Sequence, residues 1–171
     1  MGLRVKLAAG DVESARKDLE KLAAIRKILG QEDNKYWADQ IDIQIESATA
    51  WITLADGKQE QALREMRSAA DHEDKTDKHN VTPGVIVPAR ELLGEMLLET
   101  KQPAEALPQF EAVLRTASNR FNALAGAGRA AKLSGDDEKA KIYYQTMVAM
   151  CDHADGDRPE LKEAKSLLTV K

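Results

Sequence analysis

A repeat of 34 residues in the second half of the chain constrains its fold more than any other sequence feature. Matching residues recur at this offset, at Leu93 and Ala127, Gly94 and Gly128, Ala106 and Ala140, Phe110 and Tyr144, and Val113 and Met147. Within one unit, apolar residues follow helical spacing, as at Leu92, Leu93, Met96 and Leu97. A period of this length is typical of solenoids, whose repeats bury their apolar faces against one another. The repeat therefore predicts an all-α chain of antiparallel helix pairs.

The same pattern continues toward the amino terminus with a longer period. Ala50 precedes Gly94 by 44 residues, Ala62 precedes Ala106 by the same 44, and Met66 takes the aromatic position. The ten additional residues fall in residues 71–84, a polar tract without apolar periodicity that ends in a turn signature. We therefore expect a lengthened helix end followed by a loop.

The two ends of the chain differ. Asp11 is a suitable N-cap for a helix that resembles the second helix of a pair, so the array is expected to begin part-way through a unit and leave an apolar face at residues 3–29 uncovered. A longer amino-terminal portion is then expected to precede it.

The expected organisation is a partial repeat at 1–30, a repeat with long helices at 34–77, a loop at 78–86, repeats at 87–118 and 119–152, and a polar-faced capping helix at 158–170.

An apolar-Gly pair in the first helix and Ala-x3-aromatic in the second resemble the tetratricopeptide repeat (TPR) family, over roughly residues 10 to 170 and most strongly at 87–152. The chain departs from the pattern where a large aromatic is replaced by Glu46, Arg90 and Leu124, and where the closing proline is replaced by Asp74, Ser118 and Asp152. Residues 78–84 and 88–94 are also similar to the carboxy-terminal part of larger bacterial TPR proteins with no assigned function. The resemblance implies a right-handed superhelical α-solenoid with a carboxy-terminal capping helix.

In this family the concave wall, lined by first helices, is the usual binding surface. The resemblance implies that the groove is lined by Ser47, Trp51, Leu54 and Ala55, then Glu91, Glu95 and Leu98, then Ala125, Arg129 and Lys132. We expect Trp51 and Leu54 to anchor an apolar part of a partner, and Arg129 with Lys132 to read its charge. The family's clamp for chaperone carboxy-terminal peptides fits poorly, because Ser47 and Trp51 stand where it needs Lys and Asn.

Each of these aromatic and charged residues can have a structural role instead of binding a partner. Trp51 can instead pack against a neighbouring helix, and Tyr36 with Trp37 can cover the preceding helix pair, because tryptophan is heavily buried on average. Arg129 and Lys132 can instead be solvated charges near Glu91 and Glu95.

No pattern predicts catalysis, a metal or a cofactor. The tract His72, Glu73, Asp74, Asp77 and His79 lacks the ligand spacing of a zinc or calcium site, and so do Asp152, Asp155 and Asp157. Cys151 and His153 cannot face each other on a helix. Gly126 and Gly128 lie inside a helical repeat, which favours close helix packing over a phosphate loop.

Composition limits the classes of partner. The chain has 25 Lys+Arg and 29 Asp+Glu, for a formal charge of -4, and the two signs are interspersed, so nucleic acid is not an expected partner. The absence of a long uncharged apolar run predicts no membrane insertion. The single cysteine favours a reducing compartment such as the cytoplasm without excluding others.

The expected function is a non-catalytic scaffold that binds a protein or peptide in its groove, because no nucleophile, base and orienter occur together. Two alternatives remain open. The chain can be an accessory part of a larger enzyme or sensor, or a module that forms homodimers through the exposed face at residues 3–29.

Overall fold

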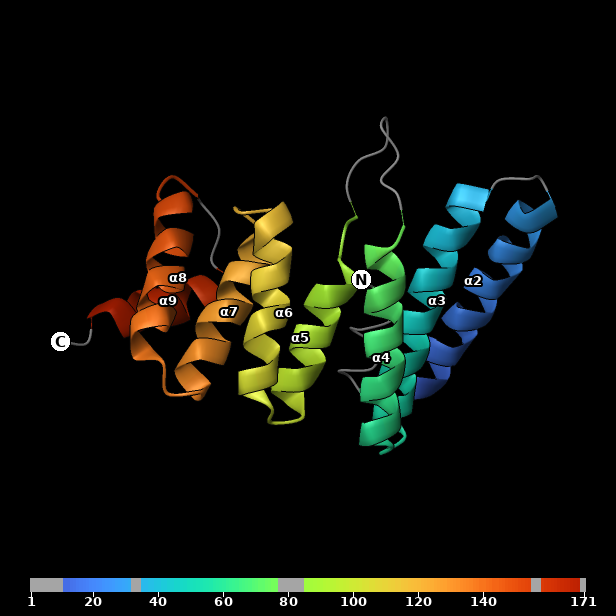
Figure 1. The fold of residues 1–171 in the computed structure, drawn as a ribbon, viewed down its shortest axis with the longest axis horizontal. Helices are drawn as coiled ribbons and strands as arrows, with labels where there is room; N and C mark the ends of the chain where they lie inside the picture. Colours follow the sequence, from blue (N-terminus) through green and yellow to red (C-terminus); the bar gives the residue numbers. More distant parts are fainter. Residues whose placement is uncertain (1–10, 32–34, 77–84, 155–157, 170–171) are drawn as a thin grey trace. The chain divides into compact units, whose positions relative to one another are not determined.

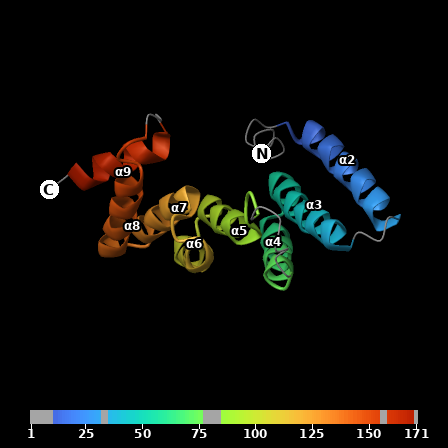
Figure 2. The ribbon, with the colours of Figure 1, turned by 90° about the horizontal axis from the view of Figure 1, so that it is seen from above.

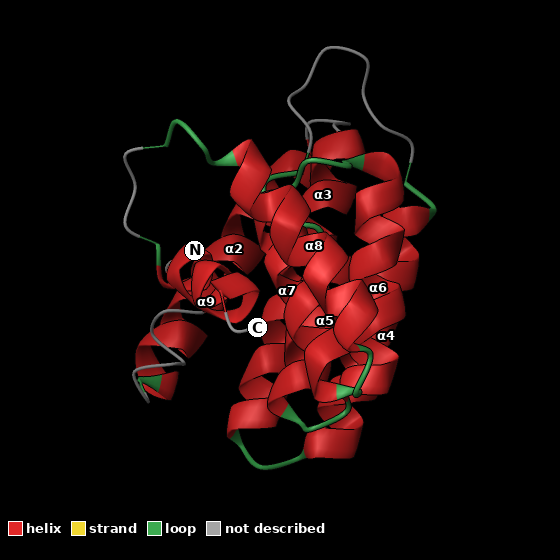
Figure 3. Cartoon of the chain, turned by 90° about the vertical axis from the view of Figure 1, so that its left-hand side faces the viewer, coloured by secondary structure: helices red, strands yellow, loops and turns green. Residues whose placement is uncertain are grey.

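The computed structural model describes residues 11–31, 35–76, 85–154 and 158–169. These residues form eight α-helices and no strand (Figures 1 and 3). The predicted all-α class is therefore confirmed. The chain divides into two compact units, Met1–Leu93 and Gly94–Lys171, and helix α5 (Ala89–Glu99) contributes residues to both.

The first unit contains α2 (Val12–Gln31), α3 (Lys35–Ala55) and α4 (Gln59–Asp74). Helix α3 packs against both α2 and α4 (Figure 2). The core of this unit combines the larger Ile43, Trp51, Ile52 and Leu63 with small or unbranched side chains that let the helices approach closely. The latter are Ala50, Ala62, Met66, Ala69 and Ala70, each 0% exposed.

The second unit contains the end of α5 together with α6 (Pro103–Thr116), α7 (Phe121–Leu133), α8 (Asp137–Met150) and α9 (Pro159–Thr169). Helix α7 packs against α6 and α8, and α9 packs against α8 and, over a smaller area, α7. As expected from its fixed φ, Pro103 is the first residue of α6.

The same turn joins the two helices of each pair. Its backbone bond spans five residues, from the N–H of Lys58 to the carbonyl of Thr53 (3.2 Å), Gln102 to Leu97 (2.8 Å) and Asp136 to Ala131 (2.9 Å). The residue before each donor is left-handed, with φ of 80° at Gly57, 62° at Lys101 and 82° at Gly135. This is the geometry of a helix end closed by a left-handed residue. The three turns are offset by 44 and then 34 residues, the periods found in the sequence.

A contact between glycine and an aromatic ring recurs in the second unit. A Cβ on Gly94 would lie 2.7 Å from Cζ of Phe110, and one on Gly126 would lie 2.4 Å from the same ring. Tyr144 packs on Gly128 in the same way. Each ring lies 16 residues after the glycine of its own repeat, so the repeated residue pair corresponds to a repeated packing contact.

The carboxy-terminal helix occupies most of the range expected for a cap. Leu161 and Ala164 are buried and Leu168 is partly buried, whereas Leu167, also expected to point inward, is 36% exposed. Residues 1–10 and most of the loop expected at 78–86 lie outside the described residues. No helix among the described residues is both long and apolar enough to cross a membrane.

Candidate functional site

The expected apolar anchor on α3 is mostly covered. Trp51 is 7% exposed and Ser47 is 5% exposed, whereas Leu54 is partly exposed and Ala55 is exposed. The burial of Trp51 favours its alternative role in packing. Trp37, for which a covering role was the alternative, remains 44% exposed and meets the ring of Tyr36 edge-on at 5.1 Å between centroids.

The expected acidic zone on α5 is also less accessible than its position in the repeat implies. Glu91 is 0% exposed and Glu95 is partly buried. Glu91 as a groove-facing residue therefore needs correction, because its carboxylate does not reach the surface. Of the remaining positions, Leu98 is partly exposed and Ala125 is 8% exposed.

The two cations of α7 that were expected to bind a charged group of a partner, Arg129 and Lys132, form ion pairs within the chain. Arg129 donates a hydrogen bond to Glu163 of α9 at 2.7 Å, and Lys132 pairs with Asp137 at 2.8 Å. The hydrogen bond from Arg129 to Glu163 raises the pKa of the guanidinium, against the opposing effect of burial. The two cations therefore do not form one vacant positive site. A partner carboxylate at Arg129 would have to compete with Glu163.

A polar hollow beside α3 and α4 is a site that the sequence did not predict. It has a volume of about 620 Å³, is open to solvent, and is lined by Glu46, Arg64, Arg67, Ser68, Asp71, His72 and Lys75. All but Glu46 come from α4 or its C-cap residue, and they recur at three- and four-residue spacing along one side of that helix. We call this group of seven residues the α4 hollow.

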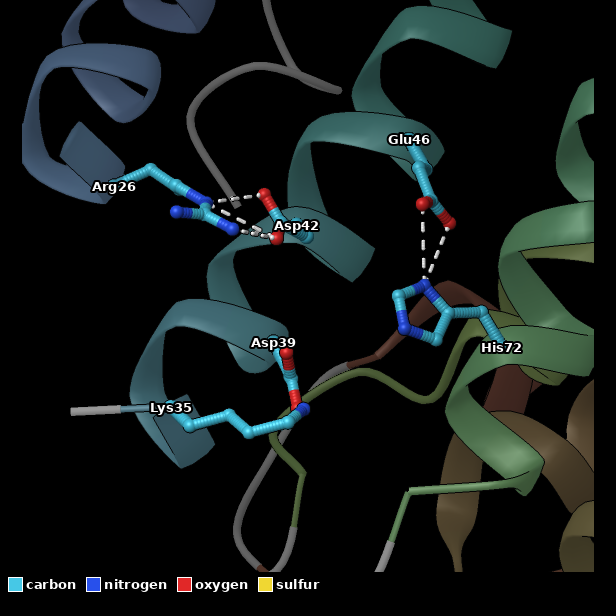
Figure 4. A network of polar contacts seen from close by, with 6 residues as sticks. All are labelled: Arg26, Lys35, Asp39, Asp42, Glu46 and His72. Carbon is cyan, nitrogen blue, oxygen red and sulfur yellow. Dashed lines mark hydrogen bonds and ion pairs between the residues drawn. The ribbon is translucent and has the colours of Figure 1, made fainter. Parts of the chain in front are cut away.

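An imidazole and a carboxylate meet in the α4 hollow. Nδ1 of His72 lies 3.1 Å from both carboxylate oxygens of Glu46, and Figure 4 shows the two side chains pointing toward each other from α4 and α3. The contact joins α3 to α4 across 26 residues of the chain.

The two carboxylates of the α4 hollow are both occupied, whereas two of its cations are not. Glu46 meets His72, and Asp71 accepts a hydrogen bond from Arg90 at 2.6 Å. Within the described part of the chain, the side chains of Arg64 and Lys75 make no hydrogen bond or ion pair. The unsatisfied charge of the α4 hollow is therefore positive.

A smaller hollow adjoins the first, and His72 and Lys75 line both. Its α3 side carries Lys35 and Asp39, paired at 2.6 Å (Figure 4). Nearby on α3, Asp42 accepts a bidentate pair of hydrogen bonds from Arg26 of α2, from Nε to Oδ1 at 2.9 Å and from Nη2 to Oδ2 at 2.8 Å. Hydrogen bonding and the charge of Asp42 raise the pKa of Arg26. This pair joins α2 to the helix that carries Glu46.

The end of α4 holds the start of α5 within the first unit. Arg90 bridges Asp71 and Asp74 at 2.6 Å and 2.7 Å, and the Glu73 carboxylate accepts the backbone N–H of Ala89 at 2.7 Å. Burial lowers the pKa of Arg90, but the hydrogen bonds to the two aspartates outweigh it and leave the pKa raised. A carboxylate at a helix N-terminus is favoured by the helix dipole.

The side chains of Ser68, His72 and Glu46 in the α4 hollow are not linked as a nucleophile, a base and an orienting group are. His72 and Glu46 have the arrangement of a base and its orienting group, but no hydrogen bond joins Ser68 to His72 in the described structure. Over residues 11–31, 35–76, 85–154 and 158–169, no three His, Cys, Asp or Glu side chains lie close enough together to hold a metal ion. Of the metal candidates weighed from the sequence, Asp77, His79, Asp155 and Asp157 lie outside these ranges.

Sequence reasoning missed the α4 hollow because its two walls are distant in the chain. Glu46 and His72 are 26 residues apart, and no sequence pattern predicts that their side chains face each other. The spacing of Arg64, Arg67, Asp71 and Lys75 was a usable signal for one side of a helix.

No protein-family model, no curated protein and no solved structure matches this chain.

Proposed function

We propose that this chain is a TPR-like, right-handed α-solenoid and acts as a non-catalytic scaffold that binds a protein or peptide. The observation that carries the proposal is the repeated helix pair, with the same five-residue turn bond ending at Lys58, Gln102 and Asp136. Repeated pairs that contact only their neighbours build extended surfaces suited to binding other chains.

In this proposal the partner meets the first helix of a pair, through Arg129 and Lys132 on α7. The exposure of Arg129 and Lys132 supports this role. A partner carboxylate would replace Glu163 or Asp137 as the acceptor, so binding would exchange one ion pair for another and the net gain would come from contacts around it.

The experiment is affinity capture from a lysate of the source cells with three versions of the chain. Arg129→Glu removes both the internal pair and the positive charge, whereas Arg129→Glu with Glu163→Arg restores the pair but leaves α7 negative. Loss of a specific partner with both variants supports recognition by Arg129. Recovery of binding in the exchanged pair shows that Arg129 only holds α9, and overturns its role as a reader of charge.

Self-association is a second candidate, favoured by one observation. Ile25 and Ile28 of α2 are 47% and 55% exposed, and they lie on the face that the repeat pattern leaves uncovered. Sedimentation of the wild-type chain and of Ile25→Gln with Ile28→Gln distinguishes the two candidates. A dimer that the double substitution dissociates supports self-association, and a wild-type monomer over the micromolar range excludes it.

A further inference from the structure

We infer that the α4 hollow binds an extended acidic peptide, through Arg64 at one end and Lys75 at the other. This site goes beyond the proposed groove, because it includes neither Arg129 nor Lys132. The observation that points to it is the charge balance of the hollow. Its own carboxylates, Glu46 and Asp71, meet His72 and Arg90, while the side chains of Arg64 and Lys75 make no hydrogen bond or ion pair in the described structure.

The spacing of the two cations selects the form of the ligand. Arg64 and Lys75 are eleven residues apart, so they lie about 16 Å from each other along the helix axis. One phosphate or carboxylate cannot meet both. An extended peptide advances about 3.3 Å per residue and alternate side chains share a face, so two acidic side chains separated by four or six residues lie on one face about 13 or 20 Å apart. Their length and that of Arg64 and Lys75 allow both pairs to form.

The middle of the hollow provides groups for the peptide between these ends. The Nε2 atom of His72 is not used in its contact with Glu46, and the Ser68 hydroxyl lies one helical turn away on the same side of α4. Because the Glu46 carboxylate accepts the proton of Nδ1, the Nε2 atom of the neutral imidazole can accept from a backbone N–H group, and the Ser68 hydroxyl can donate to a carbonyl or accept from an N–H group. A peptide supplies both kinds of partner.

The same arrangement disfavours nucleic acid. A nucleic-acid backbone carries a phosphate at every nucleotide, so it would present negative charge to Glu46 and Asp71 in the middle of the hollow as well as to the cations at its ends. An acidic peptide can place its charges at the ends alone.

The test uses the full chain and a set of ten-residue peptides with blocked termini and an uncharged fluorophore. Each contains two glutamates in a Gly and Ser background, separated by two to eight positions, and binding is followed by fluorescence anisotropy. We expect the tightest binding at a separation of four or six, and weaker binding at five, where the two glutamates point to opposite faces of an extended peptide. Arg64→Gln with Lys75→Gln should weaken binding of the tightest peptide about tenfold, as expected for the loss of two exposed ion pairs.

A matched control removes the same charge elsewhere. Lys58→Gln with Lys141→Gln changes two exposed lysines whose side chains have no partner in the described structure, and this variant should bind the peptide as the wild-type chain does. Circular dichroism and melting temperature confirm that both variants fold. In the opposite direction, Glu46→Gln removes a negative charge from the hollow and should tighten binding, which mere loss of structure would not do.

Three results would overturn the inference. The first is equal weakening by the two double variants, and the second is affinity that does not depend on glutamate separation. The third is tighter binding of a single-stranded oligonucleotide that is lost in the Arg64→Gln, Lys75→Gln variant, which would assign the hollow to nucleic acid. None of them bears on the groove, which the exchange of Arg129 and Glu163 tests separately.

Discussion

The ring of Tyr144 packs so closely on α7 that a methyl group added to Gly128 would lie 2.5 Å from its Cε1 atom. Tyr144 is 2% exposed, so the ring has little room to move away. The glycine is therefore required by the neighbouring helix, because the backbone of α7 at this position is an ordinary helix interior.

Gly128→Ala should lower the free energy of unfolding by about 1–3 kcal/mol, the usual cost of overpacking a core. Helix propensity alone predicts the opposite sign, a gain of about 1 kcal/mol. Urea denaturation followed by circular dichroism measures the difference. The cost should shrink when Tyr144→Leu is also present, and an unchanged cost would show that the tyrosine ring is not its source.

Lys101 should be replaceable by glycine with a gain in stability. Its φ of 62° is left-handed, whereas glycine occupies the matching positions 57 and 135. The left-handed conformation costs a residue with a side chain about 1–2 kcal/mol of folding free energy. Glycine avoids this cost but loses about 0.5–1 kcal/mol because it is more flexible in the unfolded chain. Lys101→Gly should therefore raise the urea midpoint, and Gly135→Lys should lower it. Shifts of the same sign in both variants would contradict the explanation.

Tyr143 and Tyr144 should respond differently to loss of the hydroxyl group. The Tyr143 hydroxyl donates to Glu111 at 2.8 Å, whereas the buried Tyr144 hydroxyl has no hydrogen-bond partner among the described residues. At pH 7, Tyr143→Phe should cost about 1 kcal/mol of unfolding free energy, and Tyr144→Phe should be neutral or slightly stabilising. Equal losses in the two variants would refute this assignment.

Stability should also fall in alkali. Burial, followed by the hydrogen bond to Glu111, raises the pKa of Tyr143 from 10.0 to about 12, and burial, followed by the charge of Glu163, raises the pKa of Tyr144 to about 12. Between these values the unfolded chain loses protons that the native chain keeps, so the free energy of unfolding decreases as pH rises above about 10. Urea titrations from pH 8 to 11 should show a shallower decrease for each Tyr→Phe variant than for the wild-type chain.

Arg90→Gln should loosen the start of α5. The guanidinium bridges Asp71 and Asp74, but both carboxylates are more than half exposed, so the loss should be modest, about 1 kcal/mol at low salt. Hydrogen exchange at the first amides of α5 should accelerate, and the difference from the wild-type chain should shrink in high salt. Arg115→Gln, on the exposed side of α6, removes the same charge and should change neither measurement.

Local patterns were sufficient for the helices. The apolar spacing of α5 to α8 and the proline that begins α6 depend on residues within a few positions of one another, because the hydrogen bonds of a helix are local. The 34-residue repeat also corresponds to contacts between helices, since Phe110 and Tyr144 pack on glycines that recur at its period. The sequence alone therefore determined the all-α class and the succession of helix pairs.

Only the tertiary structure decided which side chains reach the surface and which charges pair. Glu91 is buried although its position in the repeat placed it in the groove, and Trp51, for which the sequence allowed either role, is buried too. Exposure depends on what covers a helix and not on its own sequence. Arg129 meets Glu163 across 34 residues, and His72 meets Glu46 across 26. Such contacts form when separate helices pack, so a spacing along one helix could reveal a line of cations on α4 but not the carboxylate that faces it.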